Sequence, residues 1–410
     1  MKSRAIWITG AAVVAVAVLV LLALSTQQLV RAPLTPQEEV GQRWIKAPGS
    51  EAAFAGNDAC RDCHATEFRS HARSPHAQTV KRVSGDEKRK EFDSAGEVED
   101  PAGGVLYTTS GATPGGVFSA RAGEKTSQGT AQWVFGSGTQ AWSYLGERGD
   151  GFLEYRISYY PPVKTWSFTP GRGPQDPPTE PLGHHYNHLE AAACFGCHST
   201  ALIGTKQRLE LGQSLLNVGC ESCHGPARAH VESARQAAGK NSAGSALLKP
   251  PALTGQAVNE TCGSCHRLPP NGEARDEVIE AQLARFPGAA LVRSRCFKES
   301  EGKLTCVTCH NPHQQASRIP ESYDRACLSC HTPPQGAPCA KEKTTRCVSC
   351  HMPLQQIARK LPLRFHNHWI RPGLPDEELL QIGAALATPA AKRRCEKSLR
   401  KARASERGAA

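Results

Sequence analysis

A five-residue pattern, C-x-x-C-H, occurs seven times in this 410-residue chain and contains fourteen of its 17 cysteines. The seven copies, which we number as sites 1 to 7, begin at Cys60, Cys194, Cys220, Cys262, Cys306, Cys327 and Cys347. A random sequence of the same composition would contain about 0.03 copies. The repetition therefore reflects a chemistry that needs two thiols and an imidazole together.

C-x-x-C-H is the attachment signature of c-type haem. Each thiol forms a thioether with a vinyl group of the porphyrin, and the adjacent histidine binds the iron from one face. Structural zinc sites need C-x-x-C pairs that combine in twos, and seven is an odd number. A thioredoxin-like site needs one reactive pair beside a βαβ pattern, which this sequence lacks. Neither alternative explains a histidine after every pair.

The predicted cofactors are therefore seven covalently bound haems c, each with its iron. The attaching cysteines are Cys60, Cys63, Cys194, Cys197, Cys220, Cys223, Cys262, Cys265, Cys306, Cys309, Cys327, Cys330, Cys347 and Cys350. The predicted proximal iron ligands are His64, His198, His224, His266, His310, His331 and His351. Only two methionines occur, so methionine can be the second axial ligand of at most one haem iron. The nine remaining histidines are enough to permit bis-histidine ligation at every site.

Some of these spare histidines lie beside residues that order the backbone. His76 follows a Ser-Pro pair that suits the first turn of a helix, and we expect it to bind a haem. His71 is equally well explained as a ligand or as an ordinary core residue. His313 lies three residues past His310, and Pro312 turns the chain away from the haem of site 5. We therefore expect His313 to bind a neighbouring haem.

Other spare histidines form clusters. His230 lies six residues after the proximal histidine of site 3, which is too few to pass round a porphyrin, so it should reach a different haem. In F-H-N-H-W, His366 and His368 share a face only when the segment is extended, and one of them should ligate. In H-H-Y-N-H, His185 and His188 share a helical face, and we expect at least one to ligate.

The N-terminal 30 residues have the features of an export signal. Two basic residues precede an uncharged run from Ala5 to Leu24, which has positive-inside polarity and is long enough to span a bilayer. We predict a single-pass anchor in the cytoplasmic membrane, with the bulk of the protein in the periplasm. The alternative is secretion to the periplasm after cleavage at a small-residue site formed by Ala23 and Ser25.

The distribution of aromatic residues divides the rest of the chain. Residues 104–168 contain 12 of the 24 aromatics, in alternating runs broken by Gly, Pro and D-G, which indicates strands and hairpins. We expect a linker at 31–59, a first haem segment at 60–99, a β-rich insertion at 100–182, a six-haem core at 183–371 and a basic helical tail at 372–410. The expected fold class is mainly α with much irregular structure, with a multihaem core packed around its haems and an N-terminal transmembrane anchor.

Composition also bears on the core and the partners. Aromatic residues make up only 6% of the chain, so flat macrocycles are expected to replace part of a conventional core.

The formal charge of +11 falls to about +4 if each ferric haem with two propionates adds about −1. An exported protein does not meet nucleic acid. The expected partners are therefore periplasmic or membrane redox proteins, with the membrane itself contacted through the N-terminal helix.

Three cysteines lie outside the C-x-x-C-H pattern. Cys296 and Cys339 are candidates for a disulfide, because an exported protein meets oxidising conditions. Cys395 lies in the basic tail, where it is expected to be a free thiol on a solvated helix.

Four segments carry a resemblance to a known superfamily: G-C-E-S-C-H-G-P-A-R-A-H, L-T-C-V-T-C-H-N-P-H, C-V-S-C-H-M-P and F-H-N-H-W. They resemble exported multihaem cytochromes c related to the tetrahaem electron carrier of ammonia oxidisers. That superfamily includes hydroxylamine oxidoreductase, octahaem tetrathionate reductase and pentahaem nitrite reductase. The resemblance covers about residues 57–370 and implies largely bis-histidine haems in stacked and perpendicular pairs. It carries over His76, His230, His313 and one of His366 or His368 as distal ligands.

The chain departs from the enzymatic relatives in this superfamily. Pentahaem nitrite reductase uses C-x-x-C-K at its catalytic iron, whereas every motif here ends in histidine. No tyrosine follows Tyr323, which weakens a comparison with the tyrosine crosslink of hydroxylamine oxidoreductase. The sequence leaves open whether a lysine, such as Lys298 or Lys303, is a ligand of one haem iron. We therefore favour a heptahaem electron-transfer cytochrome, with a multihaem oxidoreductase of small nitrogen or sulfur compounds at one open-site haem as the alternative.

The haem assignment at site 1 has a direct test. Replacing Cys60 and Cys63 with serine removes both thioether bonds, so we expect the covalent haem content to fall from seven to six. Mass spectrometry of the intact protein measures this loss. An unchanged haem mass would contradict the assignment of site 1.

Overall fold

The computed structural model describes all seven sites. The described residues are 34–83, 90–92, 96–111, 115–173, 176–237, 255–267, 284–331, 345–357 and 361–371. The predicted anchor at 1–30, the tail at 372–410, Cys339 and Cys395 lie outside them, so the anchor, the disulfide and the free thiol stay predictions. Within the described residues, no helix combines the length and apolarity that crossing a membrane requires.

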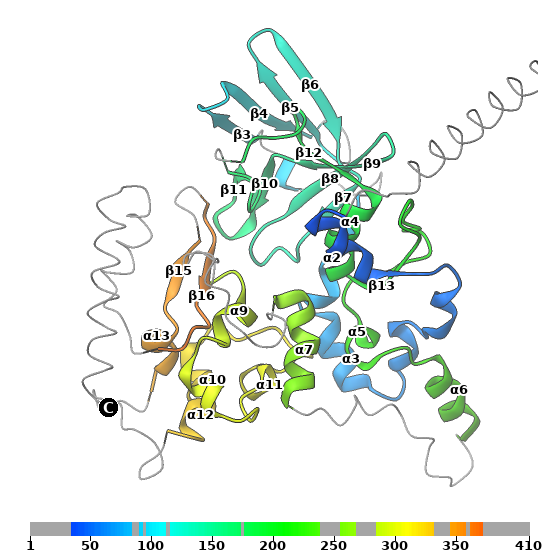
Figure 1. Ribbon diagram of the computed structural model, residues 1–410, viewed down its shortest axis with the longest axis vertical. Coiled ribbons are helices and arrows are strands. Elements are labelled where there is room, and N and C mark those ends of the chain that lie inside the picture. Colours follow the sequence, from blue (N-terminus) through cyan, green and yellow to red (C-terminus); the bar gives the residue numbers. More distant parts are fainter. Residues whose placement is uncertain are drawn as a thin grey trace, which may run out of the picture.

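Strands and helices occupy different parts of the molecule (Figure 1). Most strands gather at one end in a unit that we call the β-module, residues 96–187 together with β2. Short helices that carry the haem motifs occupy the other end. The expectation of a mainly α fold is wrong in this respect, because the described chain is a mixed helix and sheet structure with much irregular backbone. Segments that flank the insertion, and others after sites 2 and 7, also form strands.

The larger sheet of the β-module has five antiparallel strands in the order β12-β9-β8-β7-β2. Their bounds are β12 Gly183–Asn187, β9 Gly151–Tyr155, β8 Ser143–Arg148, β7 Trp133–Phe135 and β2 Val80–Arg82. The two outer strands, β2 and β12, lie outside the insertion predicted at 100–182. The sheet therefore joins the chain that follows site 1 to the chain that precedes site 2.

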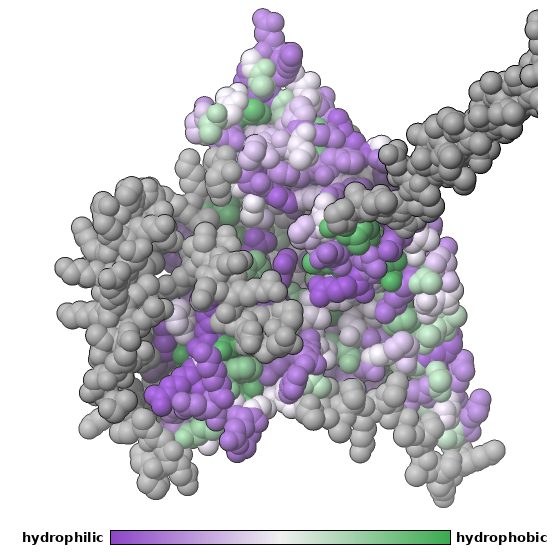
Figure 2. All heavy atoms as spheres, in the orientation of Figure 1, coloured by the Kyte–Doolittle hydropathy of each residue, from purple (hydrophilic) through white to green (hydrophobic). Residues whose placement is uncertain are grey.

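A second sheet has four strands in sequence order, each antiparallel to the next. They are β3 Gly96–Asp100, β4 Val105–Ser110, β5 Val117–Ala122 and β6 Lys125–Thr130. A separate hairpin pairs β10 Ile157–Tyr160 with β11 Thr165–Phe168. Figure 2 shows mostly hydrophilic residues over the four-stranded sheet on the face in view, whereas smaller hydrophobic spots lie nearer the helices.

Aromatic rings fill the interior of the β-module. Phe118 stacks on Tyr155 with 4.1 Å between ring centroids, and Phe92, Tyr144 and Trp166 also contact Phe118. All five side chains are buried. Such ring pairs add about 0.5–1.5 kcal/mol beyond the burial of their area. The aromatic runs that predict the strands therefore also supply their core.

Two helices connect the β-module to the haem motifs. They are α2 Pro36–Trp44 and α4 His188–Cys197, and they pack against each other. Each begins with a capping box, which satisfies backbone N–H groups at the helix start. Gly41 lies at the closest approach, because a Cβ atom there would lie 1.8 Å from the backbone oxygen of Leu189.

The other elements are short. The other α-helices in the described residues are α3 Ala65–Ala72, α5 Cys220–His224, α6 Arg228–Ala237, α7 Gly255–His266, α9 Pro287–Leu291, α10 Arg295–Glu299, α11 Cys306–Cys309, α12 Asp324–Leu328 and α13 Cys347–His351. The 3-10 helices are η1 Ser50–Ala53, η2 Asn57–Cys60, η3 His76–Gln78, η4 Lys90–Phe92, η5 Pro161–Val163 and η7 Pro320–Tyr323. The small sheets contain β1 Ile45–Lys46, β13 Ser199–Ile203 and β14 Leu215–Leu216, and β15 Leu354–Gln356 with β16 Arg364–His366. Helices this short are not stable alone, so tertiary contacts must hold them.

Replacing Gly41 with alanine tests the packing of α2 on α4. Alanine favours an isolated helix by about 1 kcal/mol, but here its methyl group meets the Leu189 carbonyl, and overpacking costs about 1–3 kcal/mol. We expect a lower free energy of unfolding, measured by denaturant titration of the haem-loaded protein. Gly212→Ala is the control, because a Cβ at this exposed glycine would meet no atom within 4 Å. A stabilised Gly41→Ala protein would contradict the close approach.

Candidate haem sites

The C-x-x-C-H motifs adopt helical turns. α5 and α13 each span a whole motif, and α4 and α7 end in one. At sites 1, 5 and 6, the histidine N–H donates to the carbonyl of the first cysteine at 2.8, 3.0 and 2.9 Å. Residues three apart share one side of a helix, so the two sulfurs of a motif can meet one edge of a porphyrin.

The β-module positions site 2. Phe195 of α4 is fully buried against Trp133 and Phe135 of β7. The ring of His198 lies edge-on to Phe135, with 5.0 Å between centroids. Its Nδ1 lies 3.0 Å from the backbone oxygen of Thr79, just before β2. When Nδ1–H donates to this oxygen, Nε2 is left as the nitrogen that can bind iron.

The same arrangement orients imidazoles near the C-terminal sites. His351 Nδ1 lies 2.8 Å from the backbone oxygen of Arg371, and His366 Nδ1 lies 2.7 Å from that of Met352. His368 Nδ1 lies 3.0 Å from the backbone oxygen of His366. A carbonyl partner of this kind fixes the tautomer of a metal-binding histidine. Because any residue type can supply a carbonyl, these partners have no signal in the sequence.

Three spare histidines face proximal histidines at the spacing of two axial ligands. The ring centroids are 6.0 Å apart for His76 and His266, 6.1 Å for His224 and His313, and 6.1 Å for His310 and His368. An imidazole nitrogen binds a first-row metal at about 2 Å, so two rings on opposite faces of one iron have centroids about 6 Å apart. The residues therefore fit a haem iron: His76 fits site 4, His313 fits site 3 and His368 fits site 5.

Burial keeps these imidazoles in the form that binds iron. Desolvation, with smaller contributions from the neighbouring His76 and His310, lowers the pKa of His266 to about 4. Desolvation likewise lowers the pKa of His368 to about 4, with a contribution from His310. Both rings are therefore neutral at pH 7, and the neutral imidazole has a nitrogen lone pair for the metal.

The segment H-H-Y-N-H adopts a different local structure from the one expected. His185 lies in β12 and His188 begins α4, so the predicted common helical face is wrong. The capping residue Asn187 separates the strand from the helix. His185 Nε2 lies 3.2 Å from the backbone oxygen of Arg148, and the Leu209 N–H donates to His188 Nδ1 at 3.2 Å. Over the part of the chain that the structure describes, neither ring contacts a proximal histidine, and their ligation stays a prediction.

Among the described residues, neither His230 nor His366 has its ring opposite the ring of a proximal histidine. His230 lies in α6, and its Nδ1 is buried with no hydrogen-bond partner among the described residues. His366 lies in β16, beside the segment that brings His368 to site 5. His71 is buried in α3, where its ring hydrogen-bonds to the backbone of Val218. A role for His230 or His366 at another haem stays a prediction.

Neighbouring motifs meet through their sulfur atoms, which stand for the thioether sulfurs of the haem-loaded protein. The sulfurs within hydrogen-bond range are Cys60 with Cys220, Cys197 with Cys265, Cys262 with Cys306, and Cys327 with Cys347. Electrostatic interactions join Cys223 to Cys262 and Cys309 to Cys327. Taken together, the sulfur contacts and the electrostatic interactions place the sites in the order 1-3-4-5-6-7, with site 2 beside site 4.

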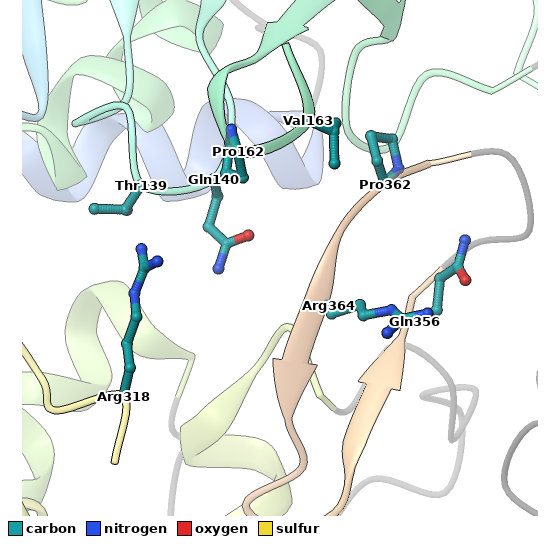
Figure 3. Close-up of a pocket in the computed structure, with 8 residues that line it drawn as sticks. All are labelled: Thr139, Gln140, Pro162, Val163, Arg318, Gln356, Pro362 and Arg364. Atoms are coloured by element: carbon teal, nitrogen blue, oxygen red, sulfur yellow. The ribbon is translucent and has the colours of Figure 1, made fainter. Parts of the chain in front are cut away.

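A pocket of about 470 Å³ lies between the β-module and the β15–β16 hairpin (Figure 3). It is lined by Thr139, Gln140, Pro162, Val163, Arg318, Gln356, Pro362 and Arg364. Figure 3 shows Arg318 pointing toward Thr139 and Gln140. Two arginines and no acidic residue line the pocket, so it suits an anion. Tyr323 lies edge-on to His310 and donates to the Ser317 backbone oxygen, which places this wall of the pocket near site 5.

Comparisons with known proteins agree with the motifs. Residues 59–115 and 178–225 match the family model described as cytochrome c554 and c-prime, and these segments contain sites 1, 2 and 3. The outer cell wall cytochrome OcwA, a solved structure, is 14% identical, covers 78% of this chain and 80% of its own, and superposes with a TM-score of 0.42. A superposition this loose does not establish a common arrangement. No curated protein matches. The seven motifs and the family match together support a multihaem c-type cytochrome.

The ring pair at site 3 makes a specific prediction. Replacing His313 with glycine removes the sixth ligand but neither thioether, so we expect full covalent haem content with one haem converted to high spin. EPR of the ferric protein measures the change, and added imidazole should reverse it. His184→Gly is the matched control, because the ring of His184 lies against Asp176 in the β-module, with Nε2 3.3 Å from the carboxylate, and His184 is not a predicted ligand. A fully low-spin His313→Gly protein would contradict the pairing with His224.

Proposed function

We propose that this chain is a heptahaem cytochrome c that transfers electrons among its haems. The observation that supports the proposal is the proximity of the seven motifs: sulfur atoms lie within hydrogen-bond range at four junctions, and the cysteines interact electrostatically at the other two. Electron transfer between cofactors falls off steeply with distance, so haems attached at neighbouring motifs exchange electrons rapidly. An isolated haem at any position would interrupt such a path.

The ligands at the middle of the path support the same function. The ring pairs at sites 3, 4 and 5 support two imidazole ligands for each of these irons, because their centroids lie 6.0 to 6.1 Å apart. An iron with six ligands has no open position for a substrate, so it changes its oxidation state without binding one. We propose that electrons pass between sites 1 and 7 through these three haems, with site 2 connected at site 4.

We propose that the protein works on the periplasmic side of the cytoplasmic membrane. The uncharged run from Ala5 to Leu24 behind two basic residues supports export and a single-pass anchor. Release into the periplasm after cleavage is the alternative. In either case, the partners are periplasmic or membrane redox proteins that deliver electrons to one end of the path and remove them from the other.

A second candidate is an oxidoreductase that acts on a small nitrogen or sulfur compound at one open-site haem. The pocket lined by Arg318 and Arg364 favours it, because two guanidinium groups suit a small oxyanion and Arg364 is two residues from His366. A reductase of this type would use the haem path to supply its electrons.

Spectroscopy of the purified protein separates the two candidates. We expect EPR and optical spectra of the ferric protein to contain only low-spin haem and to stay unchanged on addition of nitrite or hydroxylamine. This result would exclude an open-site enzyme. A high-spin haem whose spectrum shifts with either compound would instead refute the pure electron carrier.

A further inference from the structure

An asparagine or aspartate occurs three residues before the first cysteine at four of the sites. At site 3 this residue is Asn217, which accepts from the Val80 N–H of β2 at 2.9 Å. The other three are Asn57 before site 1, Asn259 before site 4 and Asp324 before site 6. Each of these three side chains accepts a hydrogen bond from the first cysteine of a different motif. The distances are 2.9 Å from Cys220 N to Asn57 Oδ1, 2.9 Å from Cys306 N to Asn259 Oδ1, and 2.9 Å from Cys347 N to Asp324 Oδ1. We call Asn57, Asn259 and Asp324 the bridging residues.

The motifs joined by a bridging residue also touch through their first sulfurs. Asn57 joins sites 1 and 3, where the sulfurs of Cys60 and Cys220 lie within hydrogen-bond range. The same relation holds for sites 4 and 5, and for sites 6 and 7. The same local geometry therefore occurs three times. In each copy, the side-chain oxygen of the bridging residue accepts from the N–H of the first cysteine of the other motif, and the first sulfurs of the two motifs lie close together.

Each bridging residue acts as a helix cap supplied from another segment. The first N–H groups of a helix lack partners within the helix and need an acceptor. An ordinary N-cap side chain supplies that acceptor from a position next to the helix. Here the acceptor lies 163, 47 or 23 residues away along the chain. A cap from so far away fixes one motif against the other as well as stabilising the helix.

The surroundings of the bridging residues reinforce this arrangement. Asn259 is 3% exposed, and its Nδ2 donates to the Leu304 backbone oxygen at 3.3 Å. Asp324 is 7% exposed, and its Oδ2 also accepts from the Arg346 N–H at 2.7 Å. At site 3, a Cβ on Gly219 would lie 2.3 Å from Asn57 Oδ1, so the glycine before Cys220 leaves room for the bridge.

Site 2 has no bridging residue. Ala191 occupies the position three residues before Cys194, and its side chain has no hydrogen-bonding group. The β-module holds this site instead, through Phe195 and through the Thr79 carbonyl at His198. The sulfur contact between Cys197 and Cys265 joins site 2 to site 4 through second cysteines, not first ones.

We propose that Asn57, Asn259 and Asp324 are positioning residues that hold the haems in three pairs, sites 1 and 3, sites 4 and 5, and sites 6 and 7, with the haem of site 2 unpaired. The proposal rests on the proposed electron-transfer function and gives it an internal organisation. Electron exchange is fastest within a pair, and the steps between pairs set the rate along the path.

Magnetic coupling between ferric haems provides the test, because coupling depends on how closely the two irons are held. Asn259→Leu removes the bridging oxygen at similar side-chain volume, whereas Asn259→Asp keeps an oxygen at that position. Asn187→Leu is the matched control, because it removes an asparagine cap that bonds to no cysteine: Asn187 accepts from the Glu190 N–H at 2.8 Å and donates to Glu38 of α2 at 3.2 Å. EPR of the ferric haem-loaded protein measures the coupled intensity, and peptide mass spectrometry locates each haem.

We expect Asn259→Leu to lose about one third of the coupled intensity, Asp324→Leu to lose another third, and the double variant to lose the sum, because the two sites are separate. Asn259→Asp and Asn187→Leu should keep the wild-type coupling. If Asn259→Leu instead loses haem, the proposal requires the loss at site 4 or 5 alone, with recovery in Asn259→Asp.

Three results would overturn the proposal: a wild-type protein without coupled haems, an Asn259→Leu protein with full haem content and full coupling, or haem loss outside sites 4 and 5. These results differ from a failure of the proposed function. That failure would appear as a wild-type high-spin haem that binds nitrite or hydroxylamine, whatever the coupling of the other haems.

Discussion

A haem iron takes one axial ligand from each face, and a C-x-x-C-H motif can supply only one of them. The second ligand must come from another segment, so each six-coordinate site ties two parts of the chain together. His76 reaches site 4 from the N-terminal part, and His368 reaches site 5 from the C-terminal part. Coordination bonds and flat macrocycles can then hold a region whose helices are too short to be stable alone. The low aromatic content of the chain agrees with such a haem-filled core.

The β-module is stabilised in a different way. Its core is a packed cluster of aromatic and aliphatic side chains, which includes Leu361 and Leu363 from the segment before β16. A second cluster joins Phe152 and Phe135 of the sheet to Phe195 of α4. Among the described residues, the module therefore contacts the haem region at site 2 and at the C-terminal hairpin, and the Val80 N–H of β2 donates to Asn217 before site 3. Residues far apart in the sequence are brought together there by ordinary apolar burial.

The haem motifs could be predicted from the sequence, because covalent haem attachment requires two cysteines and a histidine at a fixed spacing. The aromatic runs between Val105 and Phe168 likewise predict strands, since alternation is a local property. The outer strands β2 and β12 were harder to predict, because each is short and is selected by pairing with the insertion. His185 and His188 show the same limit: a helical spacing has no meaning when a strand ends at Asn187. The carbonyl partners of His198 and His351 could not be predicted at all, since the backbone carries no sequence signal.

The branch at site 4 has a consequence for how charge is held. In a purely linear series, every haem lies between donor and acceptor, so an electron that stops anywhere blocks the next. Site 2 touches the series through Cys197 and Cys265 and has the β-module on its other side. It would act as a side reservoir that fills when supply exceeds demand and empties when demand exceeds supply. A partner that accepts several electrons in quick succession would then draw them from site 2, even when the donor supplies electrons at a constant rate.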